Sequence, residues 1–276
     1  MNPPHVTDSN ERSVAIRIPR KGVWMFPGVP AGMLADAVVA AEALGLDEVW
    51  IADEGVARDP VAVLASVCRR TTRIRLAVGI TSPLLRHPGS IAAALATLDE
   101  LSGGRAMLGL GVGGVQSLGP FGITTDRPVA VMRDAIKTAR AVFQVEHSEN
   151  YEPPAHAFGP RSVPIWIGTR GPQMSRLAAR EADGILVSGC TAAQHIEIVE
   201  RVRATGSIEV ALHQSVSSTD HRDSVLAWDD VGERLSEEAA IHRPDALGIS
   251  LVDLNHDKQA DAVALVERAA AVLAAI

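Results

Sequence analysis

Two adjacent carboxylates are the side chains of this sequence best suited to acid–base chemistry. Asp53 and Glu54 directly follow the apolar run EVWIA, which has the composition of a buried strand. A neighbouring like charge or partial burial raises the pKa of a carboxyl, and a raised pKa suits a proton donor. Glu54 is therefore the candidate catalytic residue, and the alternative is an exposed glutamate that only caps its loop.

The glycine-rich stretch LGLGVGG has the G-x-G-x-x-G spacing of dinucleotide-binding loops at Gly109, Gly111 and Gly114. In dinucleotide-binding folds this motif opens the fold, and an acidic residue ends the next strand about 20 residues later. Here the helical stretch PVAVMRDAIKTARAVF occupies that place. We therefore favour an interpretation in which the glycines clear space for a flat ligand, with a simple loop turn as the alternative.

A second glycine-bearing loop, GTRGP, spans Gly168 to Pro172. Proline suits the first position of a helix, and a helix N-terminus beside glycines and an arginine is suited to bind an anion. The loop is a candidate phosphate site, and the alternative is a tight turn with Arg170 in solvent. Gly79 interrupts the β-branched segment RIRLAVGITSPLLRHP, where a glycine indicates a bulge or the close approach of another group.

The other chemically interesting side chains favour structural roles. Cys68 and Cys190 are too few for a disulfide scaffold and lack zinc-ligand spacing, so no metal site is expected. Trp24 either stacks on a ligand or packs on its own loop. His87 is expected to position the turn before a helix, and His213 to be a hydrogen-bonded core histidine.

Short apolar runs alternate along the chain with longer amphipathic ones. The expected strands are Val14–Ile18, Glu48–Ala52, Arg73–Ile80, Ala106–Gly111, Pro164–Gly168, Gly184–Ser188, Glu209–Ser217 and Ala246–Val252. The expected helices lie near residues 32–44, 60–70, 88–102, 128–143, 172–182, 192–204, 221–240 and 258–275. Eight strands alternating with eight helices predict an α/β fold, a single (β/α)8 TIM barrel of parallel strands. Its active site is expected in the loops after the strands, the first of which spans residues 19–31.

The chain is expected to form one domain. It has 276 residues, of which 47% are hydrophobic and 21% charged, which is enough apolar material to bury a full core. Residues 1–12 are expected to be a flexible tail, and residues 13–276 the barrel domain. The proline-rich stretch 147–164 is expected to form a short surface hairpin before the fifth strand, away from the chemistry. Core positions are expected for Trp50 and Trp166.

Charge and hydropathy argue against several functional classes. The 33 acidic and 26 basic residues give a net charge of −7, whereas a nucleic-acid-binding protein presents a basic face. No apolar run approaches the ~18 residues that span a bilayer, and the N-terminal residues contain no hydrophobic signal core. We therefore expect a cytoplasmic protein that binds a small molecule and has no nucleic-acid or membrane partner.

Five segments occur in an order that is typical of one family. They are LGLDEVWIADEG, RIRLAVGITSPLLRHP, ATLDELSGGRAMLGLGVGG, VPIWIGTRGPQMSRLA and EADGIL. Over roughly residues 40–190 they resemble the bacterial-luciferase-like superfamily of flavin- and deazaflavin-dependent oxidoreductases. The similarity is greatest to its coenzyme F420-dependent branch, typified by methylenetetrahydromethanopterin reductase. The family fold is a (β/α)8 barrel, in agreement with the strand count above, and the resemblance also implies a homodimer.

The resemblance implies how the site residues divide. Asp53 would lie near the deazaflavin ring, and Gly79 and Ile80 would be joined by a cis peptide whose bulge supports that ring. Thr81 and Gly113 would line the space between. The cofactor phosphate would bind the loop formed by Gly168, Thr169, Arg170, Gly171 and Pro172.

The chain also departs from the family pattern. Relatives often carry histidine where this chain has Glu54, and an acidic residue where it has Gly114. The sugar-phosphate dehydrogenase branch holds its substrate phosphate with lysines, whereas this chain has only Lys21, Lys137 and Lys258, so a phosphorylated sugar substrate is not expected. The segment between the seventh and eighth strands is shorter than in relatives, which predicts a more open substrate pocket.

The function implied by the resemblance is that of a coenzyme F420-dependent oxidoreductase, which moves a hydride between C5 of the deazaflavin and a small organic substrate. Two alternatives share the barrel: an FMN-dependent luciferase-like monooxygenase with a separate reductase, and a non-catalytic flavin-binding barrel. F420 is expected over FMN because the motifs around Gly79, Gly113 and Gly168–Pro172 look closer to the deazaflavin branch. A 5-deazaflavin hardly reacts with oxygen, so this activity needs no reductase partner.

Overall fold

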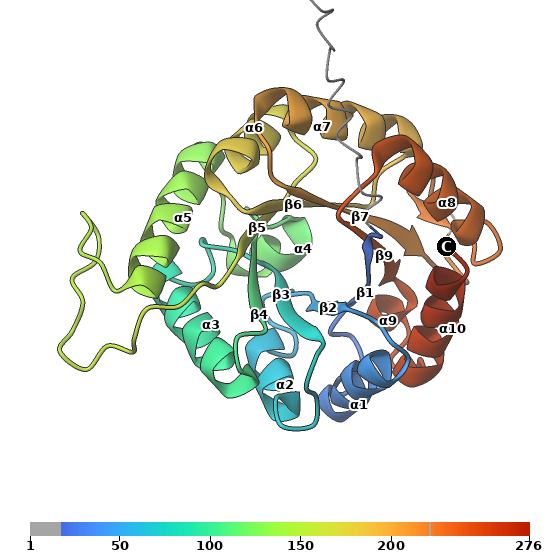
Figure 1. Cartoon of the computed structure of the whole chain (residues 1–276), viewed down its shortest axis with the longest axis horizontal. Coiled ribbons are helices and arrows are strands. Elements are labelled where there is room, and N and C mark those ends of the chain that lie inside the picture. Colours follow the sequence, from blue (N-terminus) through green and yellow to red (C-terminus); the bar gives the residue numbers. More distant parts are fainter. Residues whose placement is uncertain (1–17, 221) are drawn as a thin grey trace, which may run out of the picture.

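The computed structural model describes residues 18–220 and 222–276, in which a closed ring of eight parallel strands lies inside a ring of helices (Figure 1). The order around the ring is β6-β5-β4-β3-β2-β1-β9-β7, and β7 pairs back to β6. These strands are β1 (Arg20–Met25), β2 (Glu48–Ile51), β3 (Arg75–Thr81), β4 (Ala106–Leu110), β5 (Ile165–Gly168), β6 (Gly184–Ser188), β7 (Glu209–Val216) and β9 (Ala246–Leu251). The predicted (β/α)8 barrel is confirmed.

The outer ring consists of helices that each follow a strand along the chain. They are α1 (Ala31–Ala43), α2 (Pro60–Val67), α3 (Pro88–Ser102), α5 (Pro128–Gln144), α6 (Pro172–Glu181), α7 (Ala192–Thr205), α8 (Val231–His242) and α10 (Ala262–Ala274). Three short turns of helix lie within loops: α4 (Val115–Leu118), the 3-10 helix η1 (Gly119–Phe121) and α9 (Asp253–His256). At the start of α3, His87 Nδ1 accepts a hydrogen bond from the Gly89 N–H at 3.2 Å, in line with its predicted role in positioning this turn.

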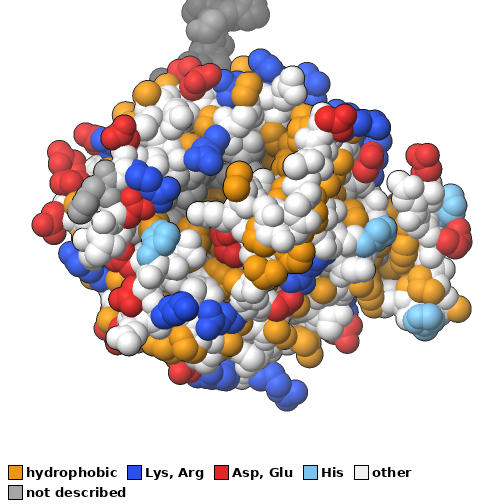
Figure 2. Space-filling view, turned by 180° about the vertical axis from the view of Figure 1, so that it is seen from behind, with side chains coloured by type: hydrophobic (Ala, Val, Ile, Leu, Met, Phe, Trp, Pro, Cys, Tyr) orange, Lys and Arg blue, Asp and Glu red, His pale blue; other side chains and the backbone are white. Residues whose placement is uncertain are grey.

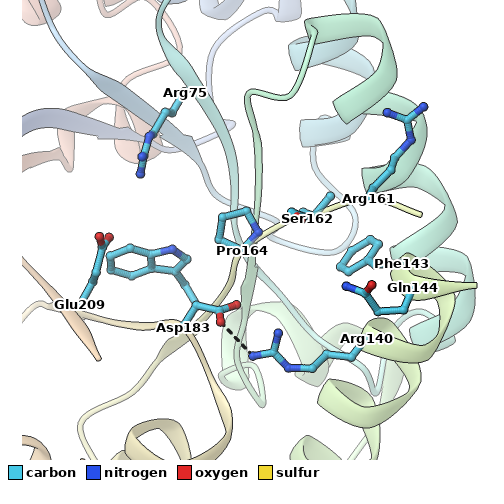
Figure 3. Close-up of a pocket in the computed structure, with 11 residues that line it drawn as sticks. Arg75, Arg140, Phe143, Gln144, Arg161, Ser162, Pro164, Asp183 and Glu209 are labelled. Atoms are coloured by element: carbon cyan, nitrogen blue, oxygen red, sulfur yellow. Dashed lines mark hydrogen bonds and ion pairs between the residues drawn. The ribbon is translucent and has the colours of Figure 1, made fainter. Parts of the chain in front are cut away.

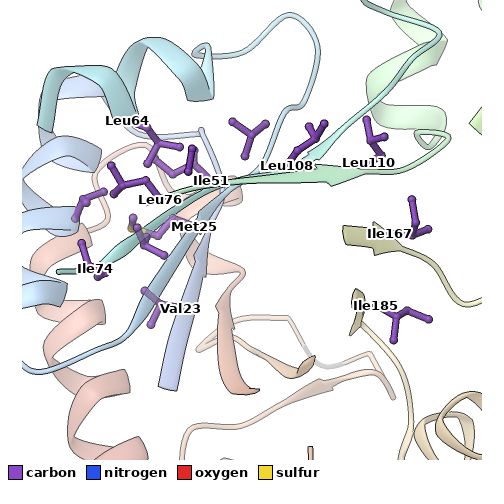
Figure 4. Packing of buried hydrophobic residues seen from close by; sticks show 14 of the residues in the cluster. Val23, Met25, Ile51, Leu64, Ile74, Leu76, Leu108, Leu110, Ile167 and Ile185 are labelled. Atoms are coloured by element: carbon purple, nitrogen blue, oxygen red, sulfur yellow. The ribbon is translucent and has the colours of Figure 1, made fainter. Parts of the chain in front are cut away.

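The hydrophobic core lies between the two rings. Successive strand residues point alternately inward and outward, so the outward set of each strand packs against the helices. On β1 this set includes Val23 and Met25, and on β4 it includes Leu108 and Leu110, all of which are buried (Figure 4). The strands thereby hold the helices in place, and their inward positions are left to fill the barrel.

Aromatic rings fill the interior of the barrel. Trp50 and Trp166 are buried there, as predicted, with ring centroids 5.7 Å apart in an edge-to-face arrangement. Glycine provides the space: a Cβ on Gly79 would lie only 2.3 Å from Cε3 of Trp50. The glycine that interrupts β3 is therefore required by the close approach of an indole. The packed rings close the barrel below the carboxyl ends of its strands.

His213 belongs to the same interior packing. It is fully buried, and its ring lies 6.5 Å from that of Trp50. Neither ring nitrogen has a hydrogen-bond partner among the described residues, so the prediction of a hydrogen-bonded core histidine is wrong. Burial, and to a lesser extent the neighbouring His195, lowers the pKa of His213 to about 3. His213 is thus a neutral ring that fills space.

Substitution of Gly248 by alanine tests this packing. The new Cβ would lie 2.3 Å from Nε2 of His213 in the closed interior, so we expect the free energy of unfolding to fall by about 1–3 kcal/mol. Urea unfolding measures the change. The control Gly32→Ala faces open space in α1 and should leave the free energy unchanged or slightly higher, because alanine favours helix over glycine. Equal effects of the two substitutions would contradict a tightly packed interior.

The first strand differs from its prediction. β1 lies inside the predicted loop 19–31, whereas the predicted strand Val14–Ile18 falls outside the described residues except for Ile18, which is not in a strand. The predicted tail 1–12 lies wholly outside them. The sequence did not indicate β1 because the strand begins with two charged residues, Arg20 and Lys21. In the structure Arg20 is paired with Glu48 at 3.0 Å and with Glu209 at 2.7 Å. These two ion pairs let an arginine begin a barrel strand.

Two connections also refine the predictions. The predicted helix 221–240 begins only at Val231, because Val225 and Leu226 form a short strand, β8, that pairs with the end of β7. The stretch 147–164 forms a hairpin with one antiparallel bridge, Ser148 to Tyr151. It projects outward between α5 and β5 as the yellow-green segment of Figure 1. The hairpin therefore precedes the amino end of β5, as expected.

Candidate functional site

A cavity of about 460 Å³ lies over the carboxyl ends of the strands. Residues at or just beyond the ends of all eight ring strands line it. Figure 2 shows the face opposite to that of Figure 1, and near its centre acidic side chains lie next to hydrophobic ones. Barrels of this type carry their active sites at the carboxyl ends of the strands, so the cavity is the candidate active site.

A second pocket, of about 430 Å³, lies at the amino ends of the strands, around Arg75 and Pro164 (Figure 3). Its charged side chains are largely paired: Arg140 Nη2 lies 3.0 Å from Asp183 Oδ1, and Arg161 Nη2 lies 2.6 Å from the exposed Glu100. None of the site residues predicted from the sequence lines this pocket. We therefore place the chemistry at the carboxyl end of the barrel.

Asp53 is the anchored carboxylate of the pair. It is buried just beyond the end of β2 and lines the cavity. Its Oδ2 accepts a hydrogen bond from Thr81 Oγ1 at 2.7 Å and lies 3.3 Å from Nε of Arg86, while its Oδ1 accepts the Gly55 N–H at 3.1 Å. These three donors fix the orientation of Asp53 as a hydrogen-bond acceptor.

Glu54, in contrast, is half-buried at the cavity and forms no side-chain hydrogen bond with another described residue. Burial raises the pKa of the Glu54 carboxyl, and the charge of Asp53 raises it further. These are the two causes expected from the sequence. The neutral acid, which can give up a proton, therefore persists to higher pH than for an ordinary glutamate.

Ile80 forms part of the cavity lining and is framed by glycines. The Gly79–Ile80 peptide is cis, as the resemblance implies, and the register between β3 and β4 shifts at this point. A Cβ on Gly111 or on Gly168 would lie 2.3 or 2.7 Å from Cδ1 of Ile80. Glycine at both positions therefore lets the isoleucine side chain lie flat against the neighbouring strands.

The loop after β4 lines the cavity with two glycines, Gly113 and Gly114, beside Val112, Gln116 and Ser117. Gly113 has a φ of 94°, in the left-handed region that favours glycine, and a Cβ there would lie 3.0 Å from Cγ of Leu118. Gly114 has no atom within 4 Å of an added Cβ. Beside Ile80 these glycines leave an even surface, and the cavity volume lies in the range of small-molecule sites. The residues present thus fit a planar ring.

The loop after β5 lies beside the same cavity. α6 begins at Pro172 without a side-chain cap, so the N–H groups of its first turn are available to an anion. The Gly171 N–H is already bound to Thr169 Oγ1 at 3.1 Å. Arg170 is exposed and donates to the Gly189 carbonyl at 3.1 Å, which leaves its charge and its other N–H groups available to an anion. The loop fits a phosphate with fewer free donors than expected.

The predicted site residues divide into two groups. Those that line the cavity are Asp53, Glu54, Ile80, Gly113, Gly168, Thr169 and Arg170. Those that do not are Gly79, Thr81, Gly171 and Pro172. The side chain of Thr81 is buried against Asp53, so Thr81 acts on the cavity through that carboxylate. Gly79 lies beneath the cavity, where the absence of a side chain leaves room for the ring of Trp50.

Sequence reasoning missed part of the lining. Phe26, Ser188 and Ser215 face the cavity, as do residues beyond β9 such as Asn255. Ser188 had a signal in the sequence, because GILVS is an apolar strand that ends in a hydroxyl, whereas Ser215 lies inside β7 behind the polar residues His213 and Gln214. The segment after β7 also contributes Arg222 to the lining of the cavity.

The comparisons with known proteins bear on this geometry. Residues 18–270 match the family model described as luciferase-like monooxygenase. This chain belongs to that family. Within the described residues, no helix is long and apolar enough to cross a membrane, and no group of three or more His, Cys, Asp or Glu side chains is arranged to hold a metal ion.

Two curated relatives are informative. The 5,10-methylenetetrahydromethanopterin reductase of Archaeoglobus fulgidus is 31% identical over 210 residues, which cover 74% of this chain and 61% of the relative. The F420-dependent glucose-6-phosphate dehydrogenase of Kineococcus radiotolerans is 27% identical over 249 residues, which cover 77% of this chain and 73% of the relative. The chain thus spans about three fifths of the length of the reductase.

Solved structures show the same barrel. The coenzyme F420-dependent tetrahydromethanopterin reductase of Methanopyrus kandleri superposes with a TM-score of 0.63 at 25% identity, over 72% of this chain and 66% of that one. An F420-dependent secondary alcohol dehydrogenase in complex with an F420–acetone adduct gives a TM-score of 0.69 at 15% identity, over 89% of this chain and 99% of that one. The second likeness concerns the fold alone.

Proposed function

We propose that this chain is a coenzyme F420-dependent oxidoreductase that transfers a hydride between C5 of the deazaflavin and a small organic substrate. The observation that carries the proposal is the cavity, which joins an even surface around Ile80, an uncapped helix N-terminus and a glutamate of raised pKa. The two relatives named above, a methylenetetrahydromethanopterin reductase and an F420-dependent dehydrogenase, support this choice of cofactor class.

The residues of the cavity divide the work. The loop Gly168–Pro172 and the first turn of α6 would hold the phosphate, and Ile80 with the Gly113 backbone would support the ring. Asp53, fixed by Thr81 and Arg86, would accept a hydrogen bond from the bound ring. Glu54 would hold the proton that accompanies hydride transfer. When bound, F420 supplies the hydride chemistry, and the protein supplies position and electrostatics.

An FMN-dependent monooxygenase is the second candidate. Monooxygenases are among the structural neighbours, such as RslO1 of Streptomyces bottropensis, with a TM-score of 0.67 at 19% identity over 92% of this chain and 96% of that one. That likeness concerns the fold alone. F420 and FMN share a tricyclic ring and a ribityl phosphate, so the same cavity could accept either. The F420-dependent dehydrogenase of Kineococcus radiotolerans and the F420-dependent reductase structure of Methanopyrus kandleri favour the first candidate.

The reaction is tested by mixing the protein with reduced F420 and a panel of carbonyl and alkene acceptors. We expect the visible absorbance of oxidised F420 to return only when both protein and a suitable acceptor are present. Protein that oxidises no reduced F420 with any acceptor, but consumes oxygen with reduced FMN, would overturn the proposal in favour of the monooxygenase.

A further inference from the structure

The cavity has a second wall whose chemistry differs from that of the glycine-lined one. In the ring order, β1 lies directly opposite β5, which carries the candidate phosphate loop. Trp24 and Phe26 lie two residues apart at β1 and just beyond it, so both face inward. Their rings are stacked, with centroids 5.9 Å apart and planes 13° apart, and both line the cavity. An aromatic surface therefore faces the phosphate loop across the barrel.

Hydroxyl groups adjoin this aromatic surface. Ser188, Ser215 and Ser250 lie at or near the carboxyl ends of β6, β7 and β9, and Ser250 is in register with both Ser215 and Trp24. Ser188 and Ser250 bind each other at 2.9 Å. The Ser215 side chain lines the cavity and makes no hydrogen bond to another described residue. It is the hydroxyl of the three left to bind a ligand.

The charges around the cavity disfavour a strongly anionic substrate. Of the two guanidinium groups that line the cavity, Arg222 is paired with a carboxylate, with its Nε 2.8 Å from Asp220 Oδ2, and Arg170 belongs to the loop assigned to the cofactor phosphate. None of the three lysines lines the cavity, whereas Asp53 and Glu54 do. A neutral polar group therefore matches this wall better than a phosphate or carboxylate.

We propose that Trp24, Phe26 and Ser215 form the substrate subsite, and that the substrate is a planar conjugated ring with a neutral carbonyl group. Because Trp24 and Phe26 already stack on each other, the ring packs on the face of Trp24 that Phe26 leaves open, and the Ser215 hydroxyl donates to the carbonyl. This inference rests on the proposed function, because the proposed function assigns the opposite wall of the cavity, with the phosphate loop after β5, to the cofactor. It also narrows the substrate class, which neither the family nor the relatives supply for this chain.

The test measures binding to the protein without cofactor by isothermal titration calorimetry. Coumarin, a planar neutral lactone, is the probe. Coumarin-3-carboxylate is its anionic counterpart, and δ-valerolactone is a lactone without the conjugated ring. We expect coumarin to bind at least about tenfold more tightly than either of the others, because only coumarin combines the stacking ring with a neutral carbonyl.

Three variants assign the binding to the subsite. Trp24→Ala should weaken coumarin binding about tenfold through the lost stacking, and Ser215→Ala about fivefold through the lost hydrogen bond. Phe121→Ala is the matched control, because Phe121 is an aromatic residue that is 51% exposed and outside the cavity lining. It should leave coumarin binding unchanged. Trp24→Phe keeps a stacking ring and should retain most of the affinity if the alanine variant fails to fold.

The outcomes separate the two proposals. Absence of coumarin binding, equal binding of the anionic probe, or unchanged coumarin affinity in folded Trp24→Ala and Ser215→Ala would each overturn the subsite. F420 binding to the wild-type protein is measured separately. Failure of F420 to bind, with coumarin binding that depends on Trp24, would overturn the proposed cofactor and leave the subsite standing.

Discussion

Replacing Glu54 by glutamine should lower turnover with F420 and an accepted substrate by about a hundredfold or more, while F420 affinity stays close to that of the wild type. Glutamine keeps the size of the side chain and removes its acidic proton, and a positioned acid contributes about 10²–10⁴-fold. Steady-state kinetics measure the loss. Glu146→Gln, at an exposed position after the end of α5, is the control and should leave turnover unchanged.

The raised pKa of Glu54 predicts the direction in which turnover changes with pH. Burial and the charge of Asp53 raise the pKa of Glu54, so its proton-bearing form is present below that raised pKa and is lost as pH rises through it. Turnover that needs the proton should fall over the same interval. Because the native state binds this proton more tightly than the unfolded chain, stability also falls there, and Glu54→Gln should not be less stable than wild type at neutral pH. Full turnover of the glutamine variant across this range would exclude Glu54 as the proton donor.

Substitution of Gly171 by leucine should weaken F420 binding by about tenfold to a hundredfold without loss of stability. The backbone at Gly171 is ordinary, with a φ of −82°, and the nearest atom to an added Cβ is Thr169 Oγ1 at 3.9 Å, so the fold has room for the side chain. The leucine would cover the N–H groups at the start of α6. Hydrogen bonds to a charged group contribute about 1.5–3 kcal/mol, which sets the expected loss.

The control for this substitution is Gly159→Leu. Gly159 lies in the exposed hairpin and has no atom within 4 Å of an added Cβ. We expect it to leave F420 affinity unchanged. Unchanged affinity in a folded Gly171→Leu variant as well would mean that the phosphate binds elsewhere.

The sequence predicted the barrel well because both faces of its strands are buried. Runs such as AMLGL have no polar residues to blur their ends, and β4 and β6 fall within a residue of their expected bounds. β1 was misplaced because its first two residues are charged, and only the structure reveals the partners Glu48 and Glu209 that neutralise Arg20. Long-range ion pairs of this kind leave no mark in a local pattern.

The site was predicted in part for a related physical reason. Asp53, Glu54 and the glycine loops stand at strand ends, where the fold itself brings residues together. The burial of Thr81 under Asp53 and the use of Arg170 to bind the Gly189 carbonyl depend on contacts between neighbouring loops. The unpartnered His213 depends on the packing of the whole interior, which no single segment specifies. The residue types therefore predicted where the site lies better than they predicted the role of each side chain in it.

The most direct test of the central claim is a fluorescence titration of the protein with F420 and, separately, with FMN. Seven of the predicted site residues line one cavity, and the named relatives are F420-dependent enzymes or reductases of a pterin substrate. Our account predicts micromolar or tighter binding of F420 and weaker binding of FMN. Micromolar or tighter binding of FMN, with none of F420, would contradict it.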